Sequence, residues 1–337
     1  MTDNAKKNKA RILLLMPKDY QLYTLVVKNL EYLGYEVTLV LTPFDRFRYA
    51  NFWEPIHHFI RKVCFNDREV KAHLMRRFNK DRQLTAIQAH APYDYGLVFR
   101  CDFFDPDVLQ QARKSVETLV AYHYDGLGVS PGVFERIPFF DRFFVFDPSD
   151  ARQYDLGYAT NFYFDYPEPA AAPSPDGKST IYYLASFHES RNEQVVAFHR
   201  YAKEVFDLVT FEMVVSRKDR KKIPRYIKEN MIIHRDQIPF EQHLERIKHS
   251  SVILDFSISA HRGYSFRVFE ALKYKKKLIT TNPHIIRAEF YHPHNIYLLD
   301  QGTAGIPEFL RKPYVDLPQE LVAKYSFSQW VNRMFAI

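Results

Sequence analysis

Glycine, cysteine and long hydrophobic runs are all scarce in this sequence. Of its 337 residues, 10 are glycine and 2 are cysteine. The shortage of glycine weakens any interpretation that depends on a glycine-rich phosphate-binding loop. Two cysteines, Cys64 and Cys101, cannot build a disulfide framework or a four-cysteine zinc site, and we expect both to be small buried residues. The 14 histidines lack the spacing of metal ligands, so no metal ion is expected.

The apolar run near the N-terminus, RILLLM, is too short for a secretory signal or a membrane span. We therefore expect a cytoplasmic protein, with attachment to the inner face of a membrane as an alternative. The net charge of +7 suits phosphate-bearing partners or an anionic membrane surface. Zinc-finger spacing, an RNP-like aromatic signature and a basic helix with heptads are missing, so nucleic acid is not an expected partner.

Hydrophobic residues make up 46% of the chain and form short apolar runs that alternate with helical patterns. Residues 10–16 have the pattern of a buried strand, residues 21–34 that of a helix ended by Gly34, and residues 35–43 that of a second strand. This order predicts a βαβ unit with a right-handed crossover. Beyond it we expect helices over residues 45–90 and in PDVLQQARKS, and strands in YDYGLVF, ETLVAYHYD, DRFFVFDP and YATNFYFDYP.

A proline-rich stretch divides the chain. Tyr166–Ser179, YPEPAAAPSPDGKS, holds four prolines and no apolar period, which is typical of a semi-rigid linker. The alternation then resumes, with strands expected in TIYYLAS, FEMVVS, MIIHR, SVILDFS, KLITTN and NIYLL, and helices in NEQVVAFHRYAKEV, RKDRKKIPRYIKEN, PFEQHLERIKHS, SFRVFEALKYKK and the tail QELVAKYSFSQWVNRMFAI.

The sequence therefore predicts an α/β protein of two Rossmann-like domains that face a cleft. The expected parts are an acceptor domain over 1–165, a linker over 166–178, a nucleotide-binding domain over 179–318 and a final helix over 319–337. Ligands in such folds bind at the carboxyl ends of the strands, near the cleft between the domains.

Several segments carry a resemblance to a known family. SVILDFS followed by GYSFRVFEALKYKKKLITTN resembles the nucleotide-binding segment of GT-B glycosyltransferases, where a strand, a loop, a helix with Glu-Ala-Leu and a second strand follow one another. YHYDG, FFDRFFVFDPSDARQY and FYFDYP resemble bacterial lipopolysaccharide and capsule biosynthesis proteins of that type. Many retaining relatives carry two Glu eight positions apart. Here Glu270 matches the second Glu, whereas Arg262 stands at the first, so a retaining mechanism is not carried over.

The resemblance implies transfer of a sugar from a nucleotide-activated donor to a bacterial surface glycan or glycolipid, without a metal ion. It also implies that the final helix, with Trp330, packs back on the first domain. LMPKDYQLY lacks the glycine-rich loop that many relatives have after the first strand. Two alternatives stay open: a non-catalytic protein that keeps the nucleotide pocket, and a sugar-nucleotide epimerase or hydrolase on the same fold.

The main candidate for the donor site is the start of the helix expected at residues 265–276. Unpaired N–H groups at Gly263, Tyr264 and Ser265 can hold a diphosphate, with Ser265 at the N-cap. Arg262 or Arg267 can neutralise the phosphates. By the resemblance, Glu270 accepts hydrogen bonds from the ribose hydroxyls. In the structural alternative, Ser265 only caps the helix and Glu270 pairs with Lys273 on a wet face.

A second candidate for the donor site lies in ASFHESRNE, between an expected strand and an expected helix. Ser186, His188 and Arg191 can reach a phosphate or the sugar from this edge. The alternative is that Ser190 or Asn192 caps the helix.

The catalytic candidates belong to the first half of the chain. Asp125 and His123, in YHYDGLGVSPG, follow a strand and can take the proton of an acceptor hydroxyl. Asp19, after the first strand, is an alternative base. Asp125 can also be explained as a turn residue before Gly126.

Residues 46–82 are strongly basic, with aromatic residues interleaved. This segment can dock on an anionic membrane surface or a phosphorylated acceptor, or it can be a solvated helix face. Its basic residues are Arg46, Arg48, Arg61, Lys62, Arg68, Lys71, Arg76, Arg77, Lys80 and Arg82.

Overall fold

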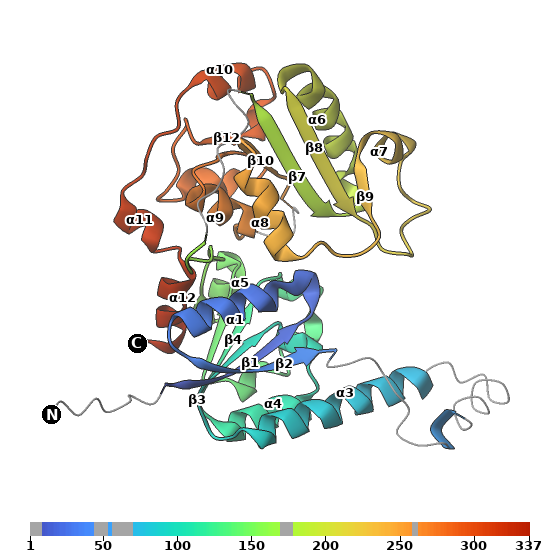
Figure 1. Cartoon of the computed structure of the whole chain (residues 1–337), viewed down its shortest axis with the longest axis vertical. Helices are drawn as coiled ribbons and strands as arrows, with labels where there is room; N and C mark the ends of the chain where they lie inside the picture. Colours follow the sequence, from blue (N-terminus) through green and yellow to red (C-terminus); the bar gives the residue numbers. More distant parts are fainter. Residues whose placement is uncertain (1–8, 44–52, 56–69, 169–177, 258–261) are drawn as a thin grey trace.

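The chain forms two parallel β-sheets of six strands each, with helices between them and around them (Figure 1). The computed structural model describes residues 9–43, 53–55, 70–168, 178–257 and 262–337. Each sheet is built by strand–helix alternation, which confirms the predicted α/β architecture of two Rossmann-like units.

The first sheet has the strand order β2-β1-β3-β4-β5-β6, with every pair parallel. Its strands are β1 (Arg11–Pro17), β2 (Glu36–Thr42), β3 (Tyr93–Phe99), β4 (Val116–His123), β5 (Arg142–Val145) and β6 (Gly157–Tyr158). Its helices are α1 (Leu22–Tyr32), α3 (Val70–Ala89), α4 (Pro106–Ser115) and α5 (Pro148–Gln153). Helices α3 and α4 lie on the face of this sheet that is remote from the second sheet (Figure 1).

The first βαβ unit follows directly from its sequence. The run from Ile12 to Met16 is fully buried in β1, as expected of a strand covered on both faces. Helix α1 buries one face and ends at Gly34, whose φ of +92° is a conformation that favours glycine. The chain then returns as β2 in register beside β1.

The second sheet has the strand order β12-β11-β10-β7-β8-β9, again all parallel. Its strands are β7 (Thr180–Ser186), β8 (Leu208–Val214), β9 (Ile232–His234), β10 (Val252–Asp255), β11 (Lys277–Thr280) and β12 (Ile296–Leu298). Its helices are α6 (Asn192–Val205), α7 (Arg225–Asn230), α8 (Phe240–Lys248), α9 (Phe266–Lys273) and α10 (Ile306–Arg311).

One apolar cluster runs from the first sheet to the second. It joins buried residues of β1 and α1 to those of α8 and α9, so the two halves share a core where they meet. The C-terminal segment adds to it: after α11 (Gln319–Ala323), helix α12 (Phe327–Phe335) packs on α1 and β4. Trp330 of α12 is fully buried, with its ring 5.6 Å from Phe99 and 4.9 Å from Tyr122.

Three element predictions were wrong in extent. The basic stretch RKDRKKIPRYIKEN is helical only in α7, because Pro224 stands at the N-cap and the residues before it form turns. The tail is broken into α11 and α12, and Ser326 caps the second helix by accepting from the Gln329 N–H. Of YATNFYFDYP, only β6 joins the sheet, while Tyr163 bridges to Ser326.

Much of the basic segment 46–82 lies outside the described residues. Within the described part, α3 carries Arg76, Arg77, Lys80 and Arg82, and Lys80 pairs with Asp107 at 2.8 Å. Among the residues that the structure describes, no helix is long and apolar enough to cross a membrane. Cys101 is buried as expected, whereas Cys64 is not among the described residues.

Candidate active site between the two sheets

A cavity of about 440 Å³ opens between the carboxyl ends of the two sheets. The first domain lines it with Asp19, Tyr20, Leu22, Arg100, Tyr124, Asp125, Phe146 and Asn161. The second lines it with residues at or just after the ends of β7, β10 and β11 and with α9 and the segment before it, including Ser186, Arg191, Asp255, Ser257, Gly263, Ser265, Arg267, Glu270 and Asn282. This is where parallel α/β sheets bind ligands, because loops and helix starts converge at the strand ends.

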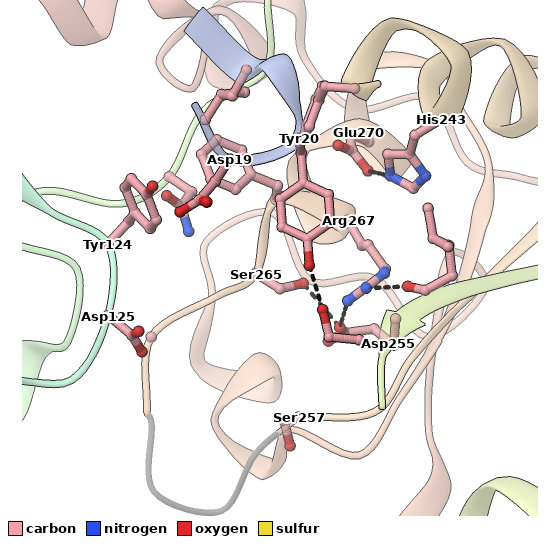
Figure 2. A pocket seen from close by; sticks show the side chains of 18 of the residues that line it. Asp19, Tyr20, Tyr124, Asp125, His243, Asp255, Ser257, Ser265, Arg267 and Glu270 are labelled. Carbon is pink, nitrogen blue, oxygen red and sulfur yellow. Dashed lines mark hydrogen bonds and ion pairs between the residues drawn. The ribbon is translucent and has the colours of Figure 1, made fainter. Parts of the chain in front are cut away.

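Asp255 organises the wall that the second domain contributes. Its side chain, 1% exposed at the end of β10, accepts hydrogen bonds from Ser265 Oγ at 2.9 Å and Thr280 Oγ1 at 3.0 Å. It also pairs with Arg267 Nη1 at 3.1 Å (Figure 2). Ser265 is thus at the N-cap of α9 as predicted, but its hydroxyl bonds Asp255 rather than the helix N–H groups.

Glu270 belongs to a buried chain of polar groups. His243 Nε2 of α8 donates to Glu270 Oε2 at 3.1 Å, and the Tyr182 hydroxyl of β7 lies 3.3 Å from His243 Nδ1. Because a carboxylate only accepts, the proton of this bond is on Nε2, and Nδ1 can accept from Tyr182. The alternative pairing of Glu270 with Lys273 is wrong: Lys273 pairs with Glu168 at 3.1 Å.

Arg191 is hydrogen-bonded to the main chain at the carboxyl ends of β7 and β10. Its Nη2 donates to the carbonyl of Ser186 at 2.8 Å and its Nη1 to that of Phe256 at 3.2 Å. Arg267 Nη2 similarly donates to the carbonyl of Leu184. The main chain therefore fixes both guanidinium groups at the end of β7.

Three buried polar atoms on residues that line the cavity have no hydrogen-bond partner in the part of the chain that the structure describes. They are Arg191 Nε, Arg267 Nε and Glu270 Oε1. Buried polar atoms in folded proteins are nearly always paired, and exceptions call for an explanation such as a missing ligand. Two cationic donors and one carboxylate acceptor match the phosphates and a ribose hydroxyl of a nucleotide.

The wall of the first domain centres on Arg100, which the sequence analysis missed. Arg100 follows β3 with a left-handed φ of +52° and binds Asp102 in a bidentate manner, at 2.9 and 2.8 Å. Its Nη1 bonds Asp125 Oδ2 at 2.9 Å. Asp125 thus lines the cavity with one carboxylate oxygen held by a charged donor, while its Oδ1 accepts from the Gly126 N–H at 3.1 Å, as the turn alternative predicts. Asp19 lines the same cavity.

His123 is separated from the cavity. It is fully buried, neither ring nitrogen has a hydrogen-bond partner among the described residues, and Nδ1 lies 3.6 Å from Asp102 Oδ1. Burial, together with the charge of Arg100, lowers the pKa of His123 to about 4. The imidazole is therefore neutral at pH 7, and it does not line the cavity.

The low pKa of His123 has a consequence for stability. The unfolded chain binds a proton at this histidine near pH 6.5, whereas the folded protein does so only near pH 4. Between these values the unfolded state holds the extra proton, so acidification through this window should cost about 3 kcal/mol of unfolding free energy. We expect His123→Leu to remove that loss. Urea unfolding at pH 7 and pH 4.5 measures it, and equal losses in both proteins would contradict the assignment.

Three other predicted donor residues do not line the cavity. His188 is exposed and bonds Ser190 Oγ at 2.7 Å. Arg262 is exposed, and its backbone N–H donates to Asp147 of the first domain at 2.8 Å. The Tyr264 hydroxyl donates to the carbonyl of His284 at 3.1 Å. The structure brings together Asp19, Asp125, Ser186, Arg191, Gly263, Ser265, Arg267 and Glu270.

Comparisons with known proteins identify solved structures that share this architecture. No family model matches the sequence, and no curated protein matches it. Among solved structures, the lipopolysaccharide outer core galactosyltransferase WaaB in its apo form is similar at a TM-score of 0.52 and 13% identity, over 97% of this chain and 99% of that one.

Two further structures are similar to the same extent. An alpha-glucosyltransferase in complex with UDP and a 13-mer DNA matches at a TM-score of 0.56 and 13% identity, over 97% of this chain and 99% of that one. A glycosyltransferase from Rickettsia africae ESF-5 matches at 0.52 and 11% identity, over 98% and 97%. At such identities the similarity concerns the fold: this chain has the GT-B fold, two Rossmann-like domains that face each other across a cleft.

Proposed function

We propose that the protein is a glycosyltransferase that moves a sugar from a nucleoside diphosphate donor to a glycan acceptor. The observation that carries the proposal is a set of three buried atoms that have no partner among the described residues: Arg191 Nε, Arg267 Nε and Glu270 Oε1, on residues that line one cavity. The GT-B fold supports it, since the compared structures are named as glycosyltransferases and one is named with bound UDP.

The second domain would hold the donor. Arg191 and Arg267 face the phosphates, and the start of α9 at Ser265 adds the positive end of a helix dipole. Glu270 accepts from a ribose hydroxyl through Oε1, because Oε2 is already bonded to His243. In the reaction these guanidinium groups, rather than a metal ion, take the charge of the departing diphosphate.

The first domain would hold the acceptor. The acceptor hydroxyl oxygen forms a bond to the anomeric carbon, the bond from that carbon to the phosphate oxygen breaks, and the nucleoside diphosphate leaves with the electron pair. Asp125 takes the hydroxyl proton, and Arg100 holds its carboxylate in place at 2.9 Å. Asp19, on the same wall, is the alternative base. A bacterial surface glycan, lipopolysaccharide or capsule, is the acceptor we propose, on the likeness to WaaB.

Thermal stability in the presence of UDP, GDP, CMP and dTDP tests the donor site. A nucleotide at 100 times its dissociation constant should add about 2.7 kcal/mol of unfolding free energy. We expect Arg191→Ala to weaken that nucleotide about 10- to 100-fold, since a charged hydrogen bond is lost. Arg225→Ala, at an 89% exposed side chain on α7, is the matched control. No stabilisation by any of the four nucleotides would overturn the proposal.

Turnover separates the transferase from its alternatives. Donor consumption that requires a glycan acceptor indicates a transferase, and consumption without one indicates a hydrolase or an epimerase. Tight nucleotide binding with no turnover of any donor indicates a binding protein that has kept the pocket.

A further inference from the structure

The loop after β1 has an unusual backbone conformation. Tyr20 and Gln21, in the 3-10 turn Asp19–Gln21 that leads into α1, have φ values of +52° and +53°. Two successive non-glycine residues in the left-handed region are uncommon, because the Cβ atom crowds the following carbonyl. Such conformations cluster at ligand-binding sites and persist where surrounding contacts hold them.

These contacts come from the opposite domain. The backbone N–H of Tyr20 donates to Gln237 Oε1 at 2.8 Å, and the Tyr20 hydroxyl hydrogen-bonds the Ser186 hydroxyl at the end of β7. Figure 2 shows the ring of Tyr20 projecting into the pocket, with its hydroxyl directed toward the strand ends of the second sheet. The left-handed turn therefore carries a phenol from the first domain across the cleft.

Two guanidinium groups lie near this hydroxyl, and one of them, that of Arg267, pairs with Asp255 at 3.1 Å. Ser186 ends β7, and the carbonyls of Ser186 and Leu184 bind the guanidinium groups of Arg191 and Arg267. The Nε of each arginine has no partner within the described ranges of the chain. An anion at this strand end can accept from these groups and from the Tyr20 O–H, whose present partner, Ser186, is a neutral hydroxyl that water or ligand can replace.

We propose that Tyr20 is a donor-binding residue supplied by the first domain, and that its hydroxyl leaves Ser186 to donate to the outer phosphate of a nucleoside diphosphate. This deepens the proposed function and rests on it. In this proposal the Tyr20 side chain donates the hydrogen bond to the phosphate, in place of the backbone N–H groups of a glycine-rich loop. Because the outer phosphate carries the bond that breaks, the same hydrogen bond strengthens as charge develops on the leaving group.

The ratio of diphosphate to monophosphate affinity tests this assignment. Binding of UDP and UMP, GDP and GMP, and dTDP and dTMP is measured by calorimetry on the full chain. Tyr20→Phe keeps the ring and removes the hydroxyl. We expect it to weaken the diphosphate about tenfold and the monophosphate less than twofold. Tyr32→Phe, at an exposed tyrosine on α1, is the matched control and should leave the ratio unchanged.

The outcomes separate the two proposals. A tyrosine that only braces the two domains would change the melting temperature and both affinities together, with the ratio intact, and that result would overturn the inference alone. If the wild-type protein binds none of these nucleotides, the proposed function and the inference fail together. A ratio that falls in Tyr20→Phe and not in Tyr32→Phe supports both.

Discussion

Glu270→Gln is expected to weaken nucleotide binding about 10- to 100-fold while the melting temperature of the free protein stays the same or rises. The side chain is 2% exposed, and no described residue hydrogen-bonds its Oε1. A buried carboxylate with only one oxygen hydrogen-bonded, here to His243, costs stability in the free protein, because the charge has been taken out of water. That cost is offset only when a ligand hydroxyl occupies the free oxygen.

The variant therefore separates function from stability. Gln is the same shape as Glu but carries no charge, so the fold keeps its packing while the strong acceptor is lost. Calorimetry with the nucleotide found in the stability screen, and a melting curve without it, measure the two effects. Glu31→Gln, on the exposed side of α1, is the matched control. A large loss of stability with unchanged affinity would show that Glu270 is a structural residue tied to His243.

Gly263→Ala is expected to disturb the contact between the domains and the donor pocket together. A Cβ atom at this position would lie 2.6 Å from the carbonyl oxygen of Phe146 and 2.4 Å from its ring, and a backbone oxygen cannot rotate away. Gly263 also lines the cavity, and its carbonyl accepts from Asn282 Nδ2 at 3.1 Å. Overpacking of this kind costs about 1–3 kcal/mol.

Gly128→Ala is the control, because a Cβ there meets no atom within 4 Å. We expect the melting temperature of Gly263→Ala to fall by several degrees and its nucleotide affinity to drop, with both unchanged in Gly128→Ala. If Gly263→Ala melts like the wild-type protein, the close approach of the 262–266 segment to the first domain does not persist in solution.

Both predictions concern residues that the sequence analysis singled out, but for partly different reasons. Glu270 was assigned to the ribose by resemblance, and its bond to His243 was not foreseen, since the two are 27 residues apart and on different helices. Gly263 was chosen for its N–H group. The structure adds a second role. Phe146 of the opposite domain packs so close to Gly263 that no Cβ atom fits between them.

Two site residues that were not predicted, Arg100 and Asp255, could have been recognised by their position in the sequence. Arg100 and Asp255 each stand at the carboxyl end of an apolar strand, in YDYGLVFR and SVILD, where polar residues are expected to face a ligand. Tyr20 carried no such signal. Its backbone conformation and its contact with Ser186 depend on Gln237 and β7, which come more than 160 residues later in the chain.

The sequence by itself determined the strand–helix alternation, the two Rossmann-like halves and the edge at which Asp125, Ser186 and Arg191 lie. These features depend on hydrophobic periodicity and on turn residues, which act between near neighbours in the chain. The tertiary structure alone decided which polar groups are paired and which are left open: Arg267 with Asp255, Glu270 with His243, and Tyr20 across the cleft. Such pairings depend on distances of a few ångströms between distant segments, and local pattern does not encode them.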